Sequence, residues 1–200
     1  MMEFKTILEE RYATKVFDGR KIDEGKIEQI KEMIRLSPSA INIQPWKIKI
    51  ISDEKLKEDL SPATMEQPQI KSCSHLLVFC ADKDLEKNAD RVLQDVKALG
   101  VPEENVKQLE LVLDTFLSNF PGEASICEAQ HNVFIAATTA LYAAKSLGID
   151  SCPMQGFDPV SYSKILEIPE NLVPTLIVPL GYPADKPMPK SRLPKEEIFF

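Results

Sequence analysis

Apolar side chains recur at helical spacing near the start of the chain. Phe4, Ile7 and Leu8 share one face of a short predicted helix. A second helix is predicted after Asp23, whose carboxylate can accept a hydrogen bond from a free amide of the first turn. Its apolar positions repeat every three or four residues through Ile34. The pair Ser37-Pro38 ends it, because the residue before a proline avoids the helical region.

Three segments have the apolar pattern of strands. Residues 46–52 alternate apolar and charged side chains, which predicts a strand with one buried face. Residues 76–80 are continuously apolar, as expected of a central strand covered on both faces. Residues 175–180 form the last predicted strand. Because helical patterns separate these strands, the sequence predicts a three-layer α/β or α+β domain with one central sheet.

The middle of the chain is helical in pattern. Residues 84–99 and the segment that ends before Pro121 predict two charged helices, which could form a flap over the rest of the protein. Residues 125–128 have the spacing of a capping box for the next helix. Residues 129–147 are apolar almost all round, which is typical of a helix in a core or a subunit interface.

The last residues have a different character. Residues 183–200 contain four prolines, which argues against a helix and predicts an extended arm lying on a surface. Before them, the pair Asp158-Pro159 begins a short predicted helix that ends near residue 168. No internal repeat is present, and we expect residues 1–200 to form one domain.

Composition narrows the possible roles. The chain has 200 residues, of which 44% are apolar, and a formal net charge of −7, so no basic field is available for a nucleic acid. No apolar run approaches the roughly 20 residues of a membrane span. Residues 1–5 lack the apolar stretch of a signal peptide, and the four cysteines form no CxxC pair, which together predict a cytoplasmic protein with reduced thiols. With two histidines and no ligand cluster, we expect no metal site.

Candidate chemistry begins with two cationic clusters. Arg11 and Lys15 flank a turn, and Lys190 and Arg192 lie on the arm. Such pairs suit a phosphate group, although spacing alone favours an ordinary solvated surface. Glycine-rich nucleotide-binding and GxSxG motifs are absent. His131 lies on the apolar helix, where a core or interface role is more common than catalysis.

Two loops have compositions suited to a flat ligand. Residues 37–46, SPSAINIQPW, combine hydroxyl, amide and apolar groups, which could line a heteroaromatic ring or simply connect two elements. Gly156, which follows Gln155, has no side chain and would let the backbone come close to a ligand ring. Judged from the local sequence alone, a plain strand-to-helix turn at Gln155-Gly156 is the favoured alternative.

Four separated motifs together resemble the FMN-dependent nitroreductase family, in its oxygen-insensitive NAD(P)H nitroreductase and dihydropteridine reductase branch. They are RYATKVFD at residues 11–18, SPSAINIQPW at 37–46, PMQGFD at 153–158 and PKSR at 189–192. Residues 74–80 also resemble the central strand of the family. The resemblance spans nearly the whole chain, with the motifs in the family's order.

The resemblance implies an α+β, three-layer α/β/α fold with a central mixed sheet, and a homodimer with two FMN molecules at the subunit interface. Arg11, Lys190 and Arg192 would hold the FMN phosphate, with Tyr12 and Ala13 beside them. Lys15 would lie near N1 and the C2 carbonyl of the flavin. The other expected cofactor-binding residues are Gln69 at the pyrimidine edge, Pro153, Met154, Gln155 and Gly156 against the ring, and Pro38, Ser39, Ala40 and Asn42 from the partner subunit.

The implied function is that of an oxidoreductase that transfers hydride from NADH or NADPH through FMN to a nitroaromatic, quinone or similar flat acceptor. No side chain need act as an acid or base. Alternatives are a family relative that reduces enoates or halogenated aromatics or destroys flavin, a flavin-binding or sensing protein with little turnover, and a structural dimer without cofactor. The chain departs from the family pattern at Ala13, Glu66 and Gln69, where the family has a serine and an Asn and Lys pair, and residues 84–120 match nothing specific.

Overall fold

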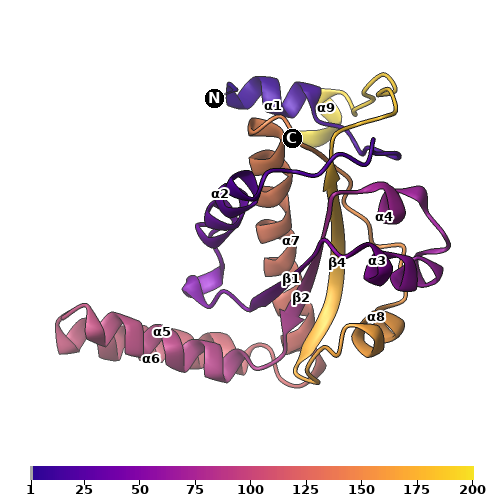
Figure 1. Ribbon diagram of the computed structural model, residues 1–200. Helices are drawn as coiled ribbons and strands as arrows, with labels where there is room; N and C mark the ends of the chain where they lie inside the picture. Colours follow the sequence, from indigo (N-terminus) through magenta and orange to yellow (C-terminus); the bar gives the residue numbers. More distant parts are fainter. Residues whose placement is uncertain (1) are drawn as a thin grey trace.

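The computed structural model describes residues 2–200 (Figure 1). These residues contain nine α-helices and four strands, with 3-10 turns at Ala40–Asn42 and Pro62–Thr64. The strands are β1 (Trp46–Ile51), β2 (His75–Asp82), β3 (Asp150–Ser151) and β4 (Leu172–Gly181). The helices are α1 (Phe4–Glu10), α2 (Glu24–Arg35), α3 (Glu54–Leu60), α4 (Pro68–Ser72), α5 (Leu85–Ala98), α6 (Glu103–Ser118), α7 (Glu123–Ser146), α8 (Pro159–Ile165) and α9 (Lys195–Ile198).

One central sheet has the strand order β1-β2-β4-β3. All three strand pairs are antiparallel, with Ile48 opposite Phe79 and Phe79 opposite Leu176. The three-layer α+β fold is therefore confirmed, but the strands do not form the mixed sheet that was expected. Helices α3 and α4 together return the chain to the end of the sheet that it left, so β2 runs antiparallel to β1. In residues 2–200 parallel pairing is limited to an isolated bridge between Ala13 and Ser151.

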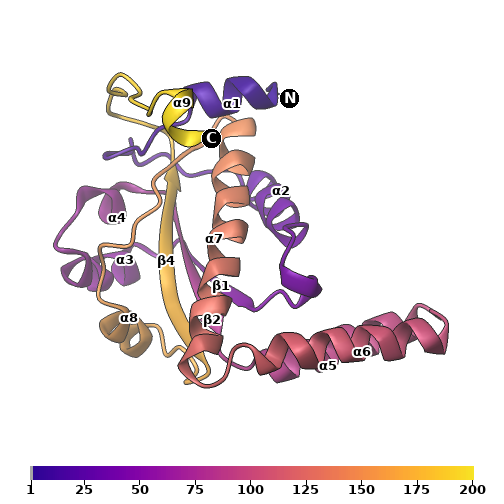
Figure 2. The same cartoon turned by 180° about the vertical axis from the view of Figure 1, so that it is seen from behind.

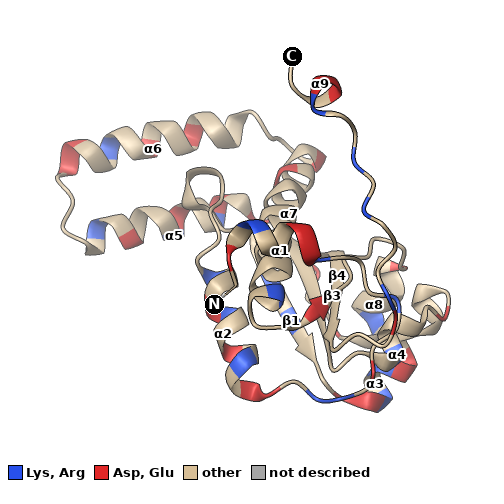
Figure 3. Ribbon diagram, turned by 90° about the horizontal axis from the view of Figure 1, so that it is seen from above, with Lys and Arg blue, Asp and Glu red and all other residues tan. Residues whose placement is uncertain are grey.

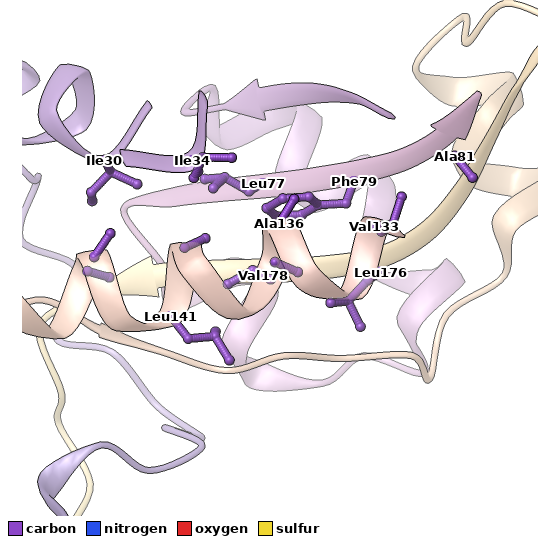
Figure 4. Close-up of a cluster of buried hydrophobic side chains, with 14 of the residues drawn as sticks. Ile30, Ile34, Leu77, Phe79, Ala81, Val133, Ala136, Leu141, Leu176 and Val178 are labelled. Atoms are coloured by element: carbon purple, nitrogen blue, oxygen red, sulfur yellow. The ribbon is translucent and has the colours of Figure 1, made fainter. Parts of the chain in front are cut away.

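Side chains of β2 pack on both faces of the sheet, as the continuous apolar run predicts. Leu77 and Phe79 point toward α2 and α7 in the larger core cluster (Figure 4). Leu76 and Val78 point the other way, into a second cluster that α3, α4 and α8 cover, where Tyr162 is fully buried. The sheet is thus the middle of three layers (Figure 2).

Helix α7 begins earlier than the capping-box spacing predicts. Its N-cap is Gly122, which has φ +58°, and Ser125 lies inside the first turn, where its hydroxyl donates to the Gly122 carbonyl at 2.7 Å. The predicted capping box is therefore wrong, because the left-handed glycine already ends the preceding turn. Nine of its 24 residues are buried, whereas Phe134 and Ile135, which form an exposed apolar stripe of α7, keep 36% and 41% of their surface exposed.

Helices α5 and α6 form the predicted pair, and they project from the body as a hairpin (Figures 1 and 2). They do not fold back over the sheet of their own chain. Arg91 ties the hairpin to the body, since its Nη2 donates to the carbonyl of Ile43 at 3.1 Å. Whether the hairpin serves as a flap stays a prediction.

The C-terminal arm is extended from Pro183 onward, as its prolines predict, but it ends in the four-residue helix α9. The expectation of no helix in residues 183–200 is therefore wrong at its end. Pro194 is the N-cap of α9, a position just before a helix where the fixed φ of proline is tolerated. Figure 3 shows this last part of the arm standing clear of the body.

Candidate functional site

The cationic turn and the arm lie side by side although they are about 170 residues apart in sequence. The Asp18 amide donates to the Tyr182 carbonyl at 2.9 Å, and the Ala184 amide donates to the Val16 carbonyl at 2.9 Å. Phe17 and Pro183 form an antiparallel bridge between these two bonds. The start of the arm thus pairs with residues 16–18 like an added strand, which brings the two predicted cationic clusters to one place.

Lys190 lies at the carboxyl end of α1. Its ammonium donates to the carbonyls of Leu8 at 2.6 Å and Arg11 at 2.8 Å, which satisfies acceptors that a helix end leaves free. Burial lowers the pKa of Lys190, and the neighbouring charges of Arg11 and Arg192 lower it further. Lys190 thus joins the arm to the Arg11 segment, with Arg192 two residues further along the arm. Cations from both segments would suit a phosphate, which several charge-assisted donors can bind on one face.

Asp185 holds the cationic turn from the arm side. Its Oδ1 accepts from the Tyr12 hydroxyl at 2.8 Å, and its Oδ2 accepts from the Lys15 amide at 2.8 Å. Burial and the hydrogen bond to Asp185 raise the pKa of Tyr12 to about 12. Sequence reasoning did not select Asp185, because nothing in local spacing connects it with a turn so distant in sequence.

Lys15 and Gln69 meet at a buried thiol. The Lys15 ammonium lies 3.9 Å from the Cys152 sulfur, and the Gln69 amide nitrogen lies 4.0 Å from it. Burial raises the pKa of the Cys152 thiol, against the lowering effect of Lys15 and Gln69. Ala13 forms the parallel bridge to Ser151, so the turn that carries Lys15 is fixed beside this thiol. Cys152 is a second residue of this region that sequence reasoning missed, although it directly precedes the 153–156 motif.

The 153–156 turn follows Cys152 and is joined to the sheet at one residue. The Met154 amide donates to the Ile177 carbonyl at 2.9 Å, and the Ile177 amide donates back to Met154 at 3.0 Å. Pro153 and Gln155 line a cavity of about 320 Å³ against the exposed side of α7, where Phe134 is another lining residue. The Gly156 carbonyl accepts from the Gln67 side chain at 3.2 Å. The turn therefore presents its two lining residues to an open space beside α7.

The SPSAINIQPW loop is held in an unusual conformation. Ile41, Asn42 and Gln44 have φ between +44° and +60° without being glycine, a strain that is concentrated at functional sites. The Ala40 amide donates to the buried Asn132 side chain at 2.8 Å, and the Ser39 hydroxyl accepts from the Gln44 amide at 2.9 Å. Asn132 is a supporting residue that the sequence pattern did not single out.

This loop is separate from the other predicted site residues of its own chain. It follows α2 on one side of α7, whereas α4, which carries Gln69, lies beyond the sheet on the other side (Figure 1). No hydrogen bond within residues 2–200 joins the loop to the Arg11–Lys15 turn or to the 153–156 turn. Pro38 instead lines a cavity of about 390 Å³ with Phe134 and Ile135. The predicted residues of one chain thus form two separate groups, which lie on either side of the exposed stripe of α7.

Unsatisfied polar atoms are concentrated on the predicted site. Five buried side-chain nitrogen or oxygen atoms in residues 2–200 have no hydrogen-bond partner. Four lie on segments named above or directly beside them, namely Arg11 Nε, Thr14 Oγ1, Ser37 Oγ and Gln69 Oε1. Buried polar groups are normally paired, so these four atoms are free to bond to a ligand or to a second chain.

Comparison with known proteins gives the family. The family model described as "Nitroreductase family" matches residues 8–182. The chain belongs to this family. A protein of Staphylococcus haemolyticus, provisionally named an NAD(P)H nitroreductase, is 33% identical over 94% of this chain and 92% of its own length.

Solved structures of nitroreductase family relatives share the fold. A provisionally named nitroreductase from Bacillus subtilis has a TM-score of 0.90 at 26% identity, covering 98% of this chain and 97% of its own. A provisionally named nitroreductase from Exiguobacterium sibiricum, solved in complex with FMN, has a TM-score of 0.88 at 23% identity, covering 99% and 96%. The three-layer arrangement described above is therefore that of the family.

Other sequence candidates have clear positions. His131 is largely exposed and faces Glu128 at 3.7 Å, so the core role considered for it is wrong. Cys73, Cys80 and Cys152 are buried and Cys127 is exposed, and all four are free thiols.

In residues 2–200 no cluster of His, Cys, Asp or Glu is arranged to hold a metal ion. No helix of this same range is both long enough and apolar enough to cross a bilayer.

Proposed function

We propose that this nitroreductase family member is an FMN-dependent oxidoreductase that uses NADH or NADPH to reduce a nitroaromatic, quinone or similar flat acceptor. The observation that carries the proposal is the position of Lys190, whose ammonium donates to the Arg11 carbonyl at 2.8 Å two residues before Arg192, with orphaned buried atoms on the predicted segments. The provisional name of the Staphylococcus relative and the FMN bound to the Exiguobacterium protein support it.

The residues present fit FMN in charge and in hydrogen-bonding groups. Arg11, Lys190 and Arg192 would bind the phosphate, and the Nε of Arg11 is a buried donor still without a partner. Tyr12 and Ala13 would lie beside it. Ala13 offers only its methyl side chain where the family has a serine, so the main chain and the neighbouring cations supply the polar contacts there.

A second group of residues would hold the ring. Lys15 and Gln69 lie together at Cys152, and the Oε1 of Gln69 is buried without a partner, available to a donor of the flavin edge. Pro153, Met154, Gln155 and Gly156 would cover one face of the ring. When bound, FMN supplies the chemistry by taking up hydride and passing electrons to the acceptor. The protein contributes position, charge and exclusion of water, and no catalytic side chain is assigned.

A homodimer would complete this site. Pro38, Ser39, Ala40 and Asn42 are separate from the cationic turn of their own chain, and a second copy is the proposed source of the loop at each site. The exposed stripe of α7 supports such an interface, since Phe134 lines cavities of about 320 and 390 Å³ and Ile135 lines the second of them. Exposed apolar patches of this kind mark association surfaces.

The decisive experiment is a visible spectrum of the purified protein before and after anaerobic addition of NADH and, separately, NADPH. We expect bound flavin absorption that at least one nucleotide bleaches and that a nitroaromatic or quinone then restores. Flavin that binds but resists both nucleotides would instead identify a binding or sensing protein. A colourless chain that takes up no FMN would contradict the proposal altogether.

A further inference from the structure

The arm reaches the cationic turn through one side chain that the proposed function does not use. Asp185 is half-buried, and each of its carboxylate oxygens accepts a different hydrogen bond. Oδ1 accepts from the Tyr12 hydroxyl at 2.8 Å, and Oδ2 accepts from the Lys15 amide at 2.8 Å. The Asp185 carbonyl also accepts from the same hydroxyl at 3.3 Å. A carboxylate suits this place because it accepts on both oxygens, whereas an amide must present one NH₂ group.

The position of Asp185 along the arm gives these bonds their importance. Main-chain pairing of the arm with residues 16–18 ends at the Ala184 amide. Beyond Asp185, the next hydrogen bonds of the arm are those of Lys190, whose ammonium binds carbonyls at the carboxyl end of α1. Residues 186–189 are exposed, and none of the hydrogen bonds found in residues 2–200 involves them. Asp185 is therefore the last anchor of the arm before its cations.

We propose that Asp185 is a positioning residue that holds Lys190 and Arg192 in register with Arg11, so that the three cations form one phosphate site. This inference rests on the proposed binding of FMN. Asp185 acts through its contacts with Tyr12 and Lys15 and does not itself touch the ligand. Contacts within the protein then order the segment before Lys190, so that no binding energy of the phosphate is used to order it.

A purely electrostatic role for Asp185 would have the opposite sign. A carboxylate near a phosphate site repels the ligand, so removing its charge alone would tighten binding. Positioning predicts weaker binding after the same substitution. The direction of the change therefore separates the two roles.

The test compares FMN with riboflavin, which lacks the phosphate. Dissociation constants are measured by flavin fluorescence for the wild type, Asp185→Ala, Asp185→Asn and Tyr12→Phe. We expect Asp185→Ala to weaken FMN binding about 10- to 100-fold, because it removes two hydrogen bonds to a charged group. Riboflavin affinity should change less than about threefold. Asp185→Asn and Tyr12→Phe each keep one of the two bonds, so their losses for FMN should be smaller.

Asp53→Ala is the matched control. The Asp53 carboxylate also accepts a main-chain hydrogen bond, from Leu56 at 2.7 Å at the start of α3, and no contact links it to the arm. It should lower the melting temperature without changing the ratio of FMN to riboflavin affinity.

Unchanged or tighter FMN binding by Asp185→Ala would overturn the inference, and so would equal losses for FMN and riboflavin. If Asp185→Ala fails to fold, Asp185→Asn keeps the size of the side chain and gives the same ratio at the proposed residue itself. A wild-type protein that binds no FMN would refute the proposed function itself. Normal wild-type binding with an unaffected variant would refute only the role of Asp185.

Discussion

Replacing Lys15 with alanine tests whether the turn faces the flavin ring. The Lys15 ammonium lies 3.9 Å from the Cys152 sulfur, in the cluster that Gln69 completes. Because Gln69 is neutral at the position where the family has a lysine, Lys15 supplies the cation on this side of the proposed ring site. A fixed positive charge there stabilises negative charge on the reduced flavin more than it stabilises the oxidised ring.

The size of the effect follows from the charge separation. Two unit charges about 4 Å apart interact by roughly 1 kcal/mol in water and about 4 kcal/mol in a partly buried setting. For a two-electron couple, about 30 mV corresponds to 1.4 kcal/mol. Lys15→Ala should therefore lower the midpoint potential of bound FMN by roughly 20–90 mV. Reduction by NADH or NADPH should slow in parallel, while FMN stays bound through its phosphate.

A spectroelectrochemical titration of the wild type and the variant measures this shift. Lys15→Arg keeps the charge and should retain most of the wild-type potential. Lys47→Ala removes an exposed lysine of β1 and should leave the potential unchanged. Equal midpoints for the wild type and Lys15→Ala would refute the reasoning, because they would mean that Lys15 does not face the flavin.

Three further outcomes can be checked independently. Arg192→Ala should weaken FMN binding about 10- to 150-fold, since one charge-assisted contact contributes roughly 1.5–3 kcal/mol, and an unchanged dissociation constant would remove the phosphate assignment. Phe134→Glu should shift the protein from dimer to monomer in sedimentation at micromolar concentration, whereas Val160→Glu on the exposed face of α8 should not. Burial lowers the pKa of His75, so the folded state takes up a proton less readily than the unfolded chain, and stability should fall as the pH drops below about 6.5. The melting temperature of His75→Gln should be less sensitive to pH over that range, and equal sensitivity would contradict this origin.

The elements of the fold could largely be predicted from the sequence because their signals are local. Asp23 caps α2 as its position predicts, accepting from the Gly25 amide at 2.9 Å. The run at Leu76–Cys80 predicted a strand covered on both faces, and the two core clusters confirm it. Local signals failed where two of them competed, as at Ser125, which has cap spacing but follows a left-handed glycine.

Strand direction and the candidate site depend on long-range contacts, which periodicity does not contain. Nothing in the spacing of the strands shows that β2 is antiparallel to both of its neighbours. Asp185 contacts Tyr12 across 173 positions, and Cys152 meets Lys15 across 137. The motifs at 11–18 and 189–192 do lie together, joined by Lys190, whereas the 37–46 loop lies apart from them in its own chain. The side chains between and behind the motifs required the folded chain.

The pairing of the two ends of the chain sets an order of events during synthesis. Residues 11–18 leave the ribosome early, whereas the partners they need at 182–192 are made about 170 residues later. At a synthesis rate of roughly 5–20 residues per second, that interval is roughly 9–34 s. Throughout it, Arg11 has neither Lys190 nor Arg192 beside it, and the acceptors at the end of α1 lack the ammonium that later binds them. An anionic ligand bound at these cations could therefore add its binding energy only after translation has passed the arm.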